Sequence, residues 1–314
     1  MDSADLSSRP TYTPTQLDRY FNHIAFDRPR ISPDDAKSAK GLEYLTALQK
    51  RHMFKVPFEN LSLHYSKHRF LSIDPEDLYA KVVERGHGGY CMENNCFFET
   101  VLRSLGFQLY SAGARVSSAV SGGNQDQGFD GWSHMVNICT IGGQRYMVDV
   151  GFGASGPIAP LPLADGKVSA GIRPQSLRLS WTNIAPNTDP SQRLWLLQSQ
   201  SDPESSWSNM YCFTETEFTP KDYTVMNHYT STSKTSWFTQ AIVCTATILE
   251  GEEVVGNLVL SKNEFKKKIH GEAKDHLTCE TEAQRVEALE TWFGITLTKG
   301  ERQGIKGTVT EIKG

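Results

Sequence analysis

The sequence predicts an α+β fold built in three successive parts. Residues 1–107 carry the spacing of amphipathic helices. Residues 108–218 carry short apolar runs separated by Gly, Pro, Ser and Asn, which is typical of a β-meander or barrel. Residues 219–314 mix the two patterns. A chain of 314 residues with 38% hydrophobic residues is long enough for two or three domains with a substantial core.

Two helices in the first part share the same start signal, a capping side chain followed by proline. Thr13 and Pro14 begin one of them, and Asp74 and Pro75 begin the other. After Pro14, apolar residues recur at the spacing that places them on one helix face, namely at Leu17, Tyr20, Phe21 and Ile24.

A third helix is expected to begin at Cys91, with Gly106 as its C-terminal cap. Its apolar stripe consists of Phe98, Val101, Leu102 and Leu105. Cys91 therefore lies in the first turn of a helix, directly after "GHGGY".

Strands are expected in the second part at "HMVNICTI", "RYMVDV", "LRLSW" and "LWLL". The third part has strands near "AIVCTATIL" and "VVGNLVL", and then a helix in "ETEAQRVEALETWFGI" whose capping box is Thr281 with Gln284. The loop "SSAVSGGNQDQGFDG" (117–131) is long, and we expect it to be flexible and to border a binding site.

Charge and hydropathy argue against nucleic-acid and membrane partners. The formal net charge is -4 and the pI is about 6.2, so there is no global basic field. The polar start "MDSADLSSRPTYTP" has no apolar signal core, and no long apolar run could cross a bilayer, so we expect a cytoplasmic protein. The six cysteines are widely spaced without a C-x-x-C, which favours reduced thiols and argues against a metal site.

The stretch "HMVNICTIGGQRYMVDVGFG" predicts a hairpin that brings a histidine to an aspartate. Gly142-Gly143 is a two-residue turn signal, and its register places Asp149 opposite Val136. Asp149 then shares a sheet face with His134 at a separation that side chains bridge. An aspartate in an apolar strand needs a partner, and this one would hold one ring nitrogen of His134 and leave the other for chemistry. The alternative is a polar pair at a sheet edge.

The segment "GFGASG" (151–156) matches the glycine pattern of dinucleotide-binding loops but lacks their context. Such a loop opens a helix that presents amides to phosphate. Here "PIAPLPL" follows, and its prolines prevent a helix from starting. The sequence therefore argues against a dinucleotide site.

Cys91 has the local setting of a nucleophile. A helix start favours the thiolate and should lower the pKa of the thiol, and the preceding glycines let the backbone approach a substrate and leave amides for an oxyanion. With His134 and Asp149 it predicts a Cys-His-Asp site of the papain or transglutaminase type. The alternative is an inert buried thiol, which we expect for Cys96, Cys139, Cys212, Cys244 and Cys279.

Four segments resemble the arylamine N-acetyltransferase family and follow the family's order over most of the chain. They are "VPFENLSLH" (56–64), "GGYCMENN" (88–95), "HMVNI" with "VDVGFG", and "MNHYTSTSKTSWF" (226–238). The long loops and the C-terminal portion look most like fungal members. The resemblance implies an N-terminal helical bundle (1–107), a central antiparallel β-barrel (108–218) and a C-terminal α/β lid (219–314).

The resemblance also implies a reaction and a set of site residues. The family transfers an acetyl group from acetyl-CoA to an aromatic amine or hydrazine by a ping-pong mechanism, in detoxification of foreign compounds. Cys91 matches the thioester-forming cysteine, His134 the proton shuttle and Asp149 the orienting aspartate. Acceptor-binding positions match Val116, Ser133 and Phe152, and coenzyme A contacts match Asp130, Gly131, Tyr229 and Thr235.

The cysteine loop departs from the family pattern at one position. Where the family has Arg-Gly-Gly-x-Cys, His87 replaces the arginine and Arg85 lies two residues earlier. We expect Arg85 or His87 to pair with Glu59 and support the loop, and His87 to be structural rather than a second base.

Three alternatives stay open from the sequence. The donor could be malonyl-CoA, as in some fungal relatives, although no residue that would bind the malonyl carboxylate is evident. The same triad also serves thiol hydrolases of the protease or amidase class. A catalytically inactive scaffold is the third reading, and the intact triad argues against it.

Overall fold

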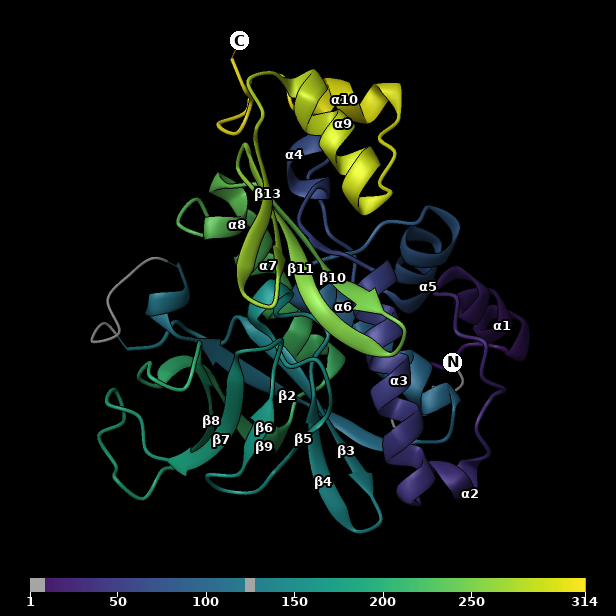
Figure 1. Ribbon diagram of the computed structural model, residues 1–314, viewed down its shortest axis with the longest axis vertical. Helices are drawn as coiled ribbons and strands as arrows, with labels where there is room; N and C mark the ends of the chain where they lie inside the picture. The colour runs from purple at the N-terminus through teal and green to yellow at the C-terminus, as the bar shows by residue number, and fades with distance from the viewer. Residues whose placement is uncertain (1–8, 122–127, 314) are drawn as a thin grey trace, which may run out of the picture.

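The computed structural model describes residues 9–121 and 128–313. In Figure 1 the N-terminal helices (purple to blue) lie on the right and the strands of the central sheet (teal) at the lower left. The C-terminal strands and helices (green to yellow) extend from the centre to the top. The fold is α+β, as predicted, with helices and two antiparallel sheets.

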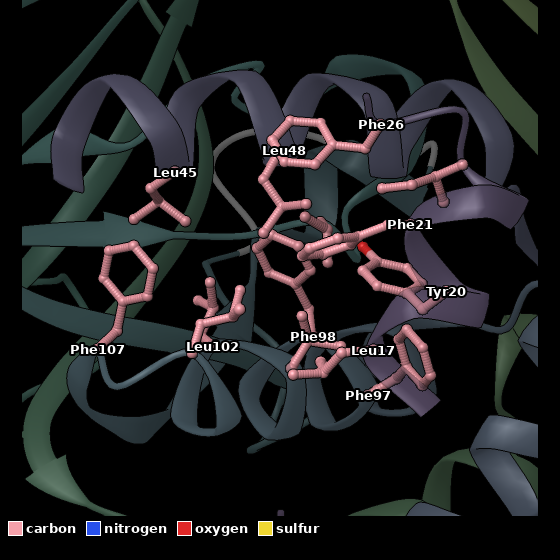
Figure 2. Close-up of a cluster of buried hydrophobic side chains, with 14 of the residues drawn as sticks. Leu17, Tyr20, Phe21, Phe26, Leu45, Leu48, Phe97, Phe98, Leu102 and Phe107 are labelled. Carbon is pink, nitrogen blue, oxygen red and sulfur yellow. The ribbon is translucent and has the colours of Figure 1, made fainter. Parts of the chain in front are cut away.

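The first part folds as helices around one apolar core. They are α1 (Pro14–His23), α2 (Pro33–Ala36), α3 (Ala39–Lys55), α4 (Ser62–Tyr65), α5 (Pro75–Tyr79), the π-helical turn η1 (Ala80–Glu84) and α6 (Cys91–Ser104). Figure 2 shows side chains of α1, α3 and α6 meeting in this core, including Tyr20, Leu48 and Phe98. Because these side chains are buried, the helix that begins at Cys91 is held by its packing.

The predicted helix starts are confirmed. The Thr13 side chain accepts a hydrogen bond from the amide of Gln16, and the Asp74 side chain accepts one from the amide of Glu76. Helix α6 begins at Cys91 and is followed by Gly106 at φ +84°, a conformation that favours glycine.

Eight strands form one antiparallel sheet in the order β5-β4-β3-β2-β9-β8-β7-β6. Because β5 also contacts β7, the sheet nearly closes into a barrel. Helix α6 packs against β2 and β3, which brings the cysteine helix to the barrel. The strands are β2 (Gln108–Val116), β3 (His134–Ile141), β4 (Gln144–Val148), β5 (Leu161–Pro162), β6 (Val168–Ala170), β7 (Ser176–Thr182), β8 (Leu194–Gln200) and β9 (Ser208–Glu217).

A second antiparallel sheet has the order β1-β10-β11-β12-β13. Strand β1 (Phe58–Glu59) comes from the helical part, pairs with β10 and bridges from Phe58 to Gly89 of the cysteine loop. The other members of this part are α7 (Pro220–Thr232), α8 (Trp237–Gln240), β10 (Val243–Glu250), β11 (Glu253–Ser261), β12 (Glu264–Ile269), β13 (Glu272–Thr278), α9 (Glu282–Phe293) and α10 (Lys299–Gly304). The boundaries after residues 107 and 218 stay predictions.

Other sequence predictions had mixed outcomes. The capping box of Thr281 with Gln284 begins α9 as predicted. Helix α3, strands β12 and β13, and the helical form of α7 were not predicted. Of the long loop 117–131, Ser118–Ser121 form a 3-10 turn (η2), and residues 122–127 lie outside the described residues. No helix within 9–121 and 128–313 is long and apolar enough to cross a membrane.

Candidate active site

The backbone of the loop before Cys91 is tightly packed, and only glycine fits at positions 88 and 89. A Cβ on Gly88 would lie 1.7 Å from the carbonyl oxygen of Pro57, and one on Gly89 would lie 2.5 Å from the Cβ of Glu93. The glycine pair therefore lets the loop pass against β1 and against the first turn of α6.

A buried ion cluster lies behind this loop. The Lys81 ammonium contacts Glu59 Oε1 at 3.2 Å and Glu93 Oε1 at 2.7 Å. The other oxygen of each carboxylate accepts a hydrogen bond from a backbone amide. The donor is the Leu61 amide for Glu59 and the Tyr90 amide, at 3.0 Å, for Glu93. Burial alone would lower the pKa of Lys81, but the two carboxylates raise it above its usual value.

The prediction that Arg85 or His87 pairs with Glu59 was wrong, because Glu59 forms its ion pair with Lys81. Arg85 is half-exposed and pairs with Glu301 of α10, at 2.8 Å. The His87 ring is buried and contacts the carbonyl of Thr296 at 3.4 Å. Lys81, which lies in the π-helical turn η1, supplies the cation.

The hairpin places His134 against Asp149 as predicted. Strand β3 pairs with β4 in the register Asn137 to Val148, so Asp149 follows at the end of the ladder. His134 Nε2 lies 2.8 Å from Asp149 Oδ2, and both side chains are buried. The bonded nitrogen is Nε2, so Nδ1 is the ring nitrogen left for other chemistry.

Four donors surround the Asp149 carboxylate. Besides His134, the Tyr211 hydroxyl donates to Oδ2 at 2.8 Å, the Asn95 side chain donates to Oδ1 at 2.9 Å, and the Gly151 amide donates to Oδ1 at 2.8 Å. Burial would raise the pKa of Asp149, but His134 and the other donors outweigh it and hold the pKa below its usual range. The carboxylate is therefore kept ionised.

Sequence reasoning missed Asn95 and Tyr211. Asn95 lies one helical turn after Cys91, and its side-chain oxygen also accepts from the Val150 amide at 3.0 Å. Its place in "CMENN" on the helix face of Cys91 was a usable signal. Tyr211 comes from β9, and nothing in its neighbourhood along the sequence indicates a contact with Asp149.

Burial raises the pKa of the Cys91 thiol, and the nearby Asp149 carboxylate adds to this. The amides of Met92 and Cys91 act in the opposite direction with smaller effect. The expectation of a pKa lowered by the helix start is thus corrected, because burial outweighs the helix amides. Removal of the thiol proton then requires a base, and His134 shares the cavity wall with Cys91.

One cavity of about 560 Å³ lies between the barrel, α7, α8 and the second sheet. Cys91 and His134 line it, and Cys91 Sγ donates to the carbonyl of Ser133 at 3.5 Å. Asp149 is buried behind His134. The other candidate residues on the wall are Val116, Ser133 and Phe152 together with Asp130, Gly131, Tyr229 and Thr235.

Phe152 packs on the histidine. Its ring centroid lies 5.2 Å from that of His134 and 4.7 Å from that of Tyr211. The segment "GFGASG" that contains it forms only a 3-10 turn, η4 (Gly153–Ser155), so it does not open a helix. Within the described part of the chain, no cluster of three or more His, Cys, Asp or Glu could hold a metal ion.

The family of the chain follows from comparison with known proteins. A family model described as N-acetyltransferase matches residues 41–302. The chain belongs to the arylamine N-acetyltransferase family. The resemblance seen in the four sequence segments is therefore confirmed, and the protein is an acyltransferase.

Relatives of this acyltransferase cover nearly all of it. An N-malonyltransferase, FDB2, of Gibberella moniliformis is 38% identical over 96% of this chain and 94% of its own. Arylamine N-acetyltransferase 1 of Oryctolagus cuniculus is 27% identical over 90% and 95%. The structure of Mycobacterium marinum arylamine N-acetyltransferase in complex with CoA matches with a TM-score of 0.77 at 25% identity, over 94% of this chain and 99% of that one.

Proposed function

We propose that this protein is an acyl-CoA–dependent arylamine N-acyltransferase that works through a thioester on Cys91. The observation that carries the proposal is the shared cavity wall of Cys91 and His134, with the buried Asp149 carboxylate bonded to the histidine at 2.8 Å. Val116, Ser133 and Phe152 are proposed to contact the acceptor. Asp130, Gly131, Tyr229 and Thr235 are proposed to contact coenzyme A.

In the first half-reaction the thiol proton of Cys91 passes to Nδ1 of His134, and the thiolate attacks the acyl carbonyl. The bond from the acyl carbon to the sulfur of coenzyme A breaks, and that sulfur takes the proton back from the imidazolium. Asp149 stabilises the imidazolium in between, which offsets the raised pKa of the buried thiol.

In the second half-reaction an aromatic amine or hydrazine attacks the Cys91 thioester. The amine nitrogen loses a proton to His134, the carbon–sulfur bond breaks, and the thiol is restored. Phe152 lines the cavity and packs on the His134 ring, which suits a flat aromatic acceptor. The release of free coenzyme A before the amine reacts gives ping-pong kinetics. A detoxifying role toward foreign amines is part of the proposal.

The donor has two candidates. Acetyl-CoA is supported by arylamine N-acetyltransferases such as the rabbit enzyme, at 27% identity. Malonyl-CoA is supported by the similarity to the fungal N-malonyltransferase, which is 38% identical over nearly the whole chain. We expect malonyl-CoA to be the preferred donor, because the higher identity covers the same length.

Mass spectrometry of the intact protein tests both points. Wild type and Cys91→Ser are incubated with equal amounts of acetyl-CoA and malonyl-CoA, and the adducts are weighed before and after addition of an aniline. We expect a single acyl adduct that is absent from Cys91→Ser and that the amine removes as the N-acylaniline. An adduct that water removes as fast as the amine would favour a thiol hydrolase. The absence of any adduct would overturn the proposal.

A further inference from the structure

The cavity around Cys91 offers no cation to a phosphorylated donor. Among the described residues that line it, none is a lysine or an arginine, and its walls carry hydroxyl groups such as those of Thr230, Thr245 and Ser261. A coenzyme A thioester carries a diphosphate and a ribose phosphate at the far end of its pantetheine arm. These anions need basic groups close to the mouth of the cavity.

The strand register puts lysines beside the cavity wall. Val259 of β11 lines the cavity, and Lys266 of β12 is directly opposite it. Lys268 is directly opposite Asn257, whose side chain donates to the carbonyl of Ala154 on the cavity wall at 3.2 Å. Directly opposed residues of an antiparallel pair point to the same side of the sheet, so both lysines lie on the cavity side.

The residues between them confirm this alternation. Lys267 is directly opposite Leu258 and lies over the ring of Trp292 of α9, 5.7 Å from its centroid. Phe265 stacks on the same ring at 4.7 Å. Odd-numbered residues of β12 therefore face α9, and even-numbered residues face the cavity side of the sheet.

The charge of the two lysines is available for a ligand. Lys266 pairs with Glu264 at 2.8 Å, but both side chains are about half exposed, and such pairs stabilise little. Lys268 makes no ion pair with any residue in 9–121 or 128–313. His276 of β13 is directly opposite Lys266 and lies 4.0 Å from Glu264.

We propose that Lys266 and Lys268, the β12 lysine pair, bind the phosphate groups of the coenzyme A donor. This inference rests on the proposed function and adds to it the residues that recognise the nucleotide end. Lysine suits the task because its ammonium is a point charge on a flexible stem that can follow a phosphate outside a rigid pocket. Strand β12 pairs with β11, whose Val259 and Ser261 line the cavity, so the pair lies beside that wall.

Steady-state kinetics with two donors test the proposal. One donor is the acyl-CoA that labels Cys91, and the other is the matching acyl-pantetheine, which has no phosphate. For Lys266→Gln with Lys268→Gln we expect KM for the acyl-CoA to rise about tenfold. We expect kcat, and KM for the acyl-pantetheine, to stay at their wild-type values. Lys267→Gln is the control, because it removes one lysine charge from the opposite face of the same strand and should leave both constants unchanged.

A direct binding measurement distinguishes a failure of this inference from a failure of the proposed thioester chemistry. The Kd of coenzyme A itself is measured by calorimetry for wild type and for each variant, at low and at moderate salt. The double variant should bind more weakly and lose part of the salt dependence. A wild type that binds coenzyme A but forms no adduct would overturn the proposed chemistry alone.

Three results would overturn the inference. The first is an unchanged KM and Kd for the double variant. The second is an equal rise of KM for the acyl-pantetheine, which would indicate a loss of fold rather than of phosphate contact. The third is a weaker binding of coenzyme A that occurs only in Lys234→Gln, because Lys234 lies next to Thr235 of the cavity wall and is a competing cation.

Discussion

His134 Nε2 and Asp149 Oδ2 lie 2.8 Å apart across the hairpin of β3 and β4, and both side chains are almost completely buried. The Asp149 carboxylate also accepts hydrogen bonds from the Tyr211 hydroxyl, the Asn95 side chain and the Gly151 amide. This arrangement holds a buried negative charge beside one nitrogen of the ring. In the proposed reaction this charge would stabilise the imidazolium that forms when His134 takes the thiol proton.

Replacing Asp149 by asparagine should therefore abolish most of the activity. The amide has no charge for the imidazolium and can donate to Nε2, which favours the wrong tautomer. We expect acylation of Cys91 to slow by about 10²–10⁴-fold, measured in single turnover. Asp275→Asn on the exposed strand β13 is the control and should behave as wild type. Near-normal acylation in Asp149→Asn would reject the triad.

Replacing Lys81 by methionine should destabilise the fold. It leaves Glu59 and Glu93 buried without a cation, which costs about 3–5 kcal/mol of unfolding free energy. Urea denaturation measures this loss, and adding Glu93→Gln should recover part of it. Arg85→Ala is the contrast, because its pair with Glu301 is partly exposed and contributes under about 1 kcal/mol. A larger loss in Arg85→Ala than in Lys81→Met would mean that Lys81 is not the supporting cation.

Adding one methyl group at Gly151 should displace the nucleophile. A Cβ there would lie 2.6 Å from the carbonyl oxygen of Cys91 and 2.8 Å from its Cα, and backbone atoms have little room to move. We expect Gly151→Ala to lower kcat/KM by about 100-fold, because a shift of about 1 Å in a reacting group is that costly. Gly300→Ala in α10 meets nothing within 4 Å and should leave kcat/KM unchanged.

Acid should destabilise the protein through two buried histidines. Burial lowers the pKa of His52 to about 3 and that of His64 to about 4, from 6.5. Between pH 4 and 6.5 the unfolded chain binds protons that the folded chain excludes. The free energy of unfolding should have its full value above pH 6.5. Below pH 6.5 it should fall by about 1.4 kcal/mol per pH unit for each histidine.

His52→Gln, followed by urea denaturation at several pH values, checks this dependence. The glutamine can keep a hydrogen bond to the Tyr20 hydroxyl, which lies 3.0 Å from His52 Nδ1, and it does not titrate. The variant should lose the share of the pH slope that one histidine contributes. An unchanged slope would show that His52 is not the titrating group.

Local features of the fold could be predicted from the sequence. Thr13 and Asp74 begin helices because a capping side chain satisfies amides only a few residues away. The register of the hairpin follows from the two glycines at its turn, Gly142 and Gly143, which both have positive φ. The face shared by His134 and Asp149 was predictable for that reason.

Features that depend on distant segments could not be predicted in this way. Strand β12 reads as a run of lysines, and only its pairing with β11 shows which side each lysine faces. Helix α3, at residues 39–55, was not predicted although its buried face supports α6. Its apolar positions matter through contacts with helices far along the chain.

The sequence by itself determined the three-part order of elements, the helix that begins at Cys91 and the facing of His134 toward Asp149, because capping, periodicity and turn geometry act over a few residues. Only the tertiary structure decided that Lys81 and not Arg85 balances Glu59, and that burial raises the pKa of the Cys91 thiol. Ion pairing and desolvation depend on which groups are brought together in space, and spacing along the chain does not state that.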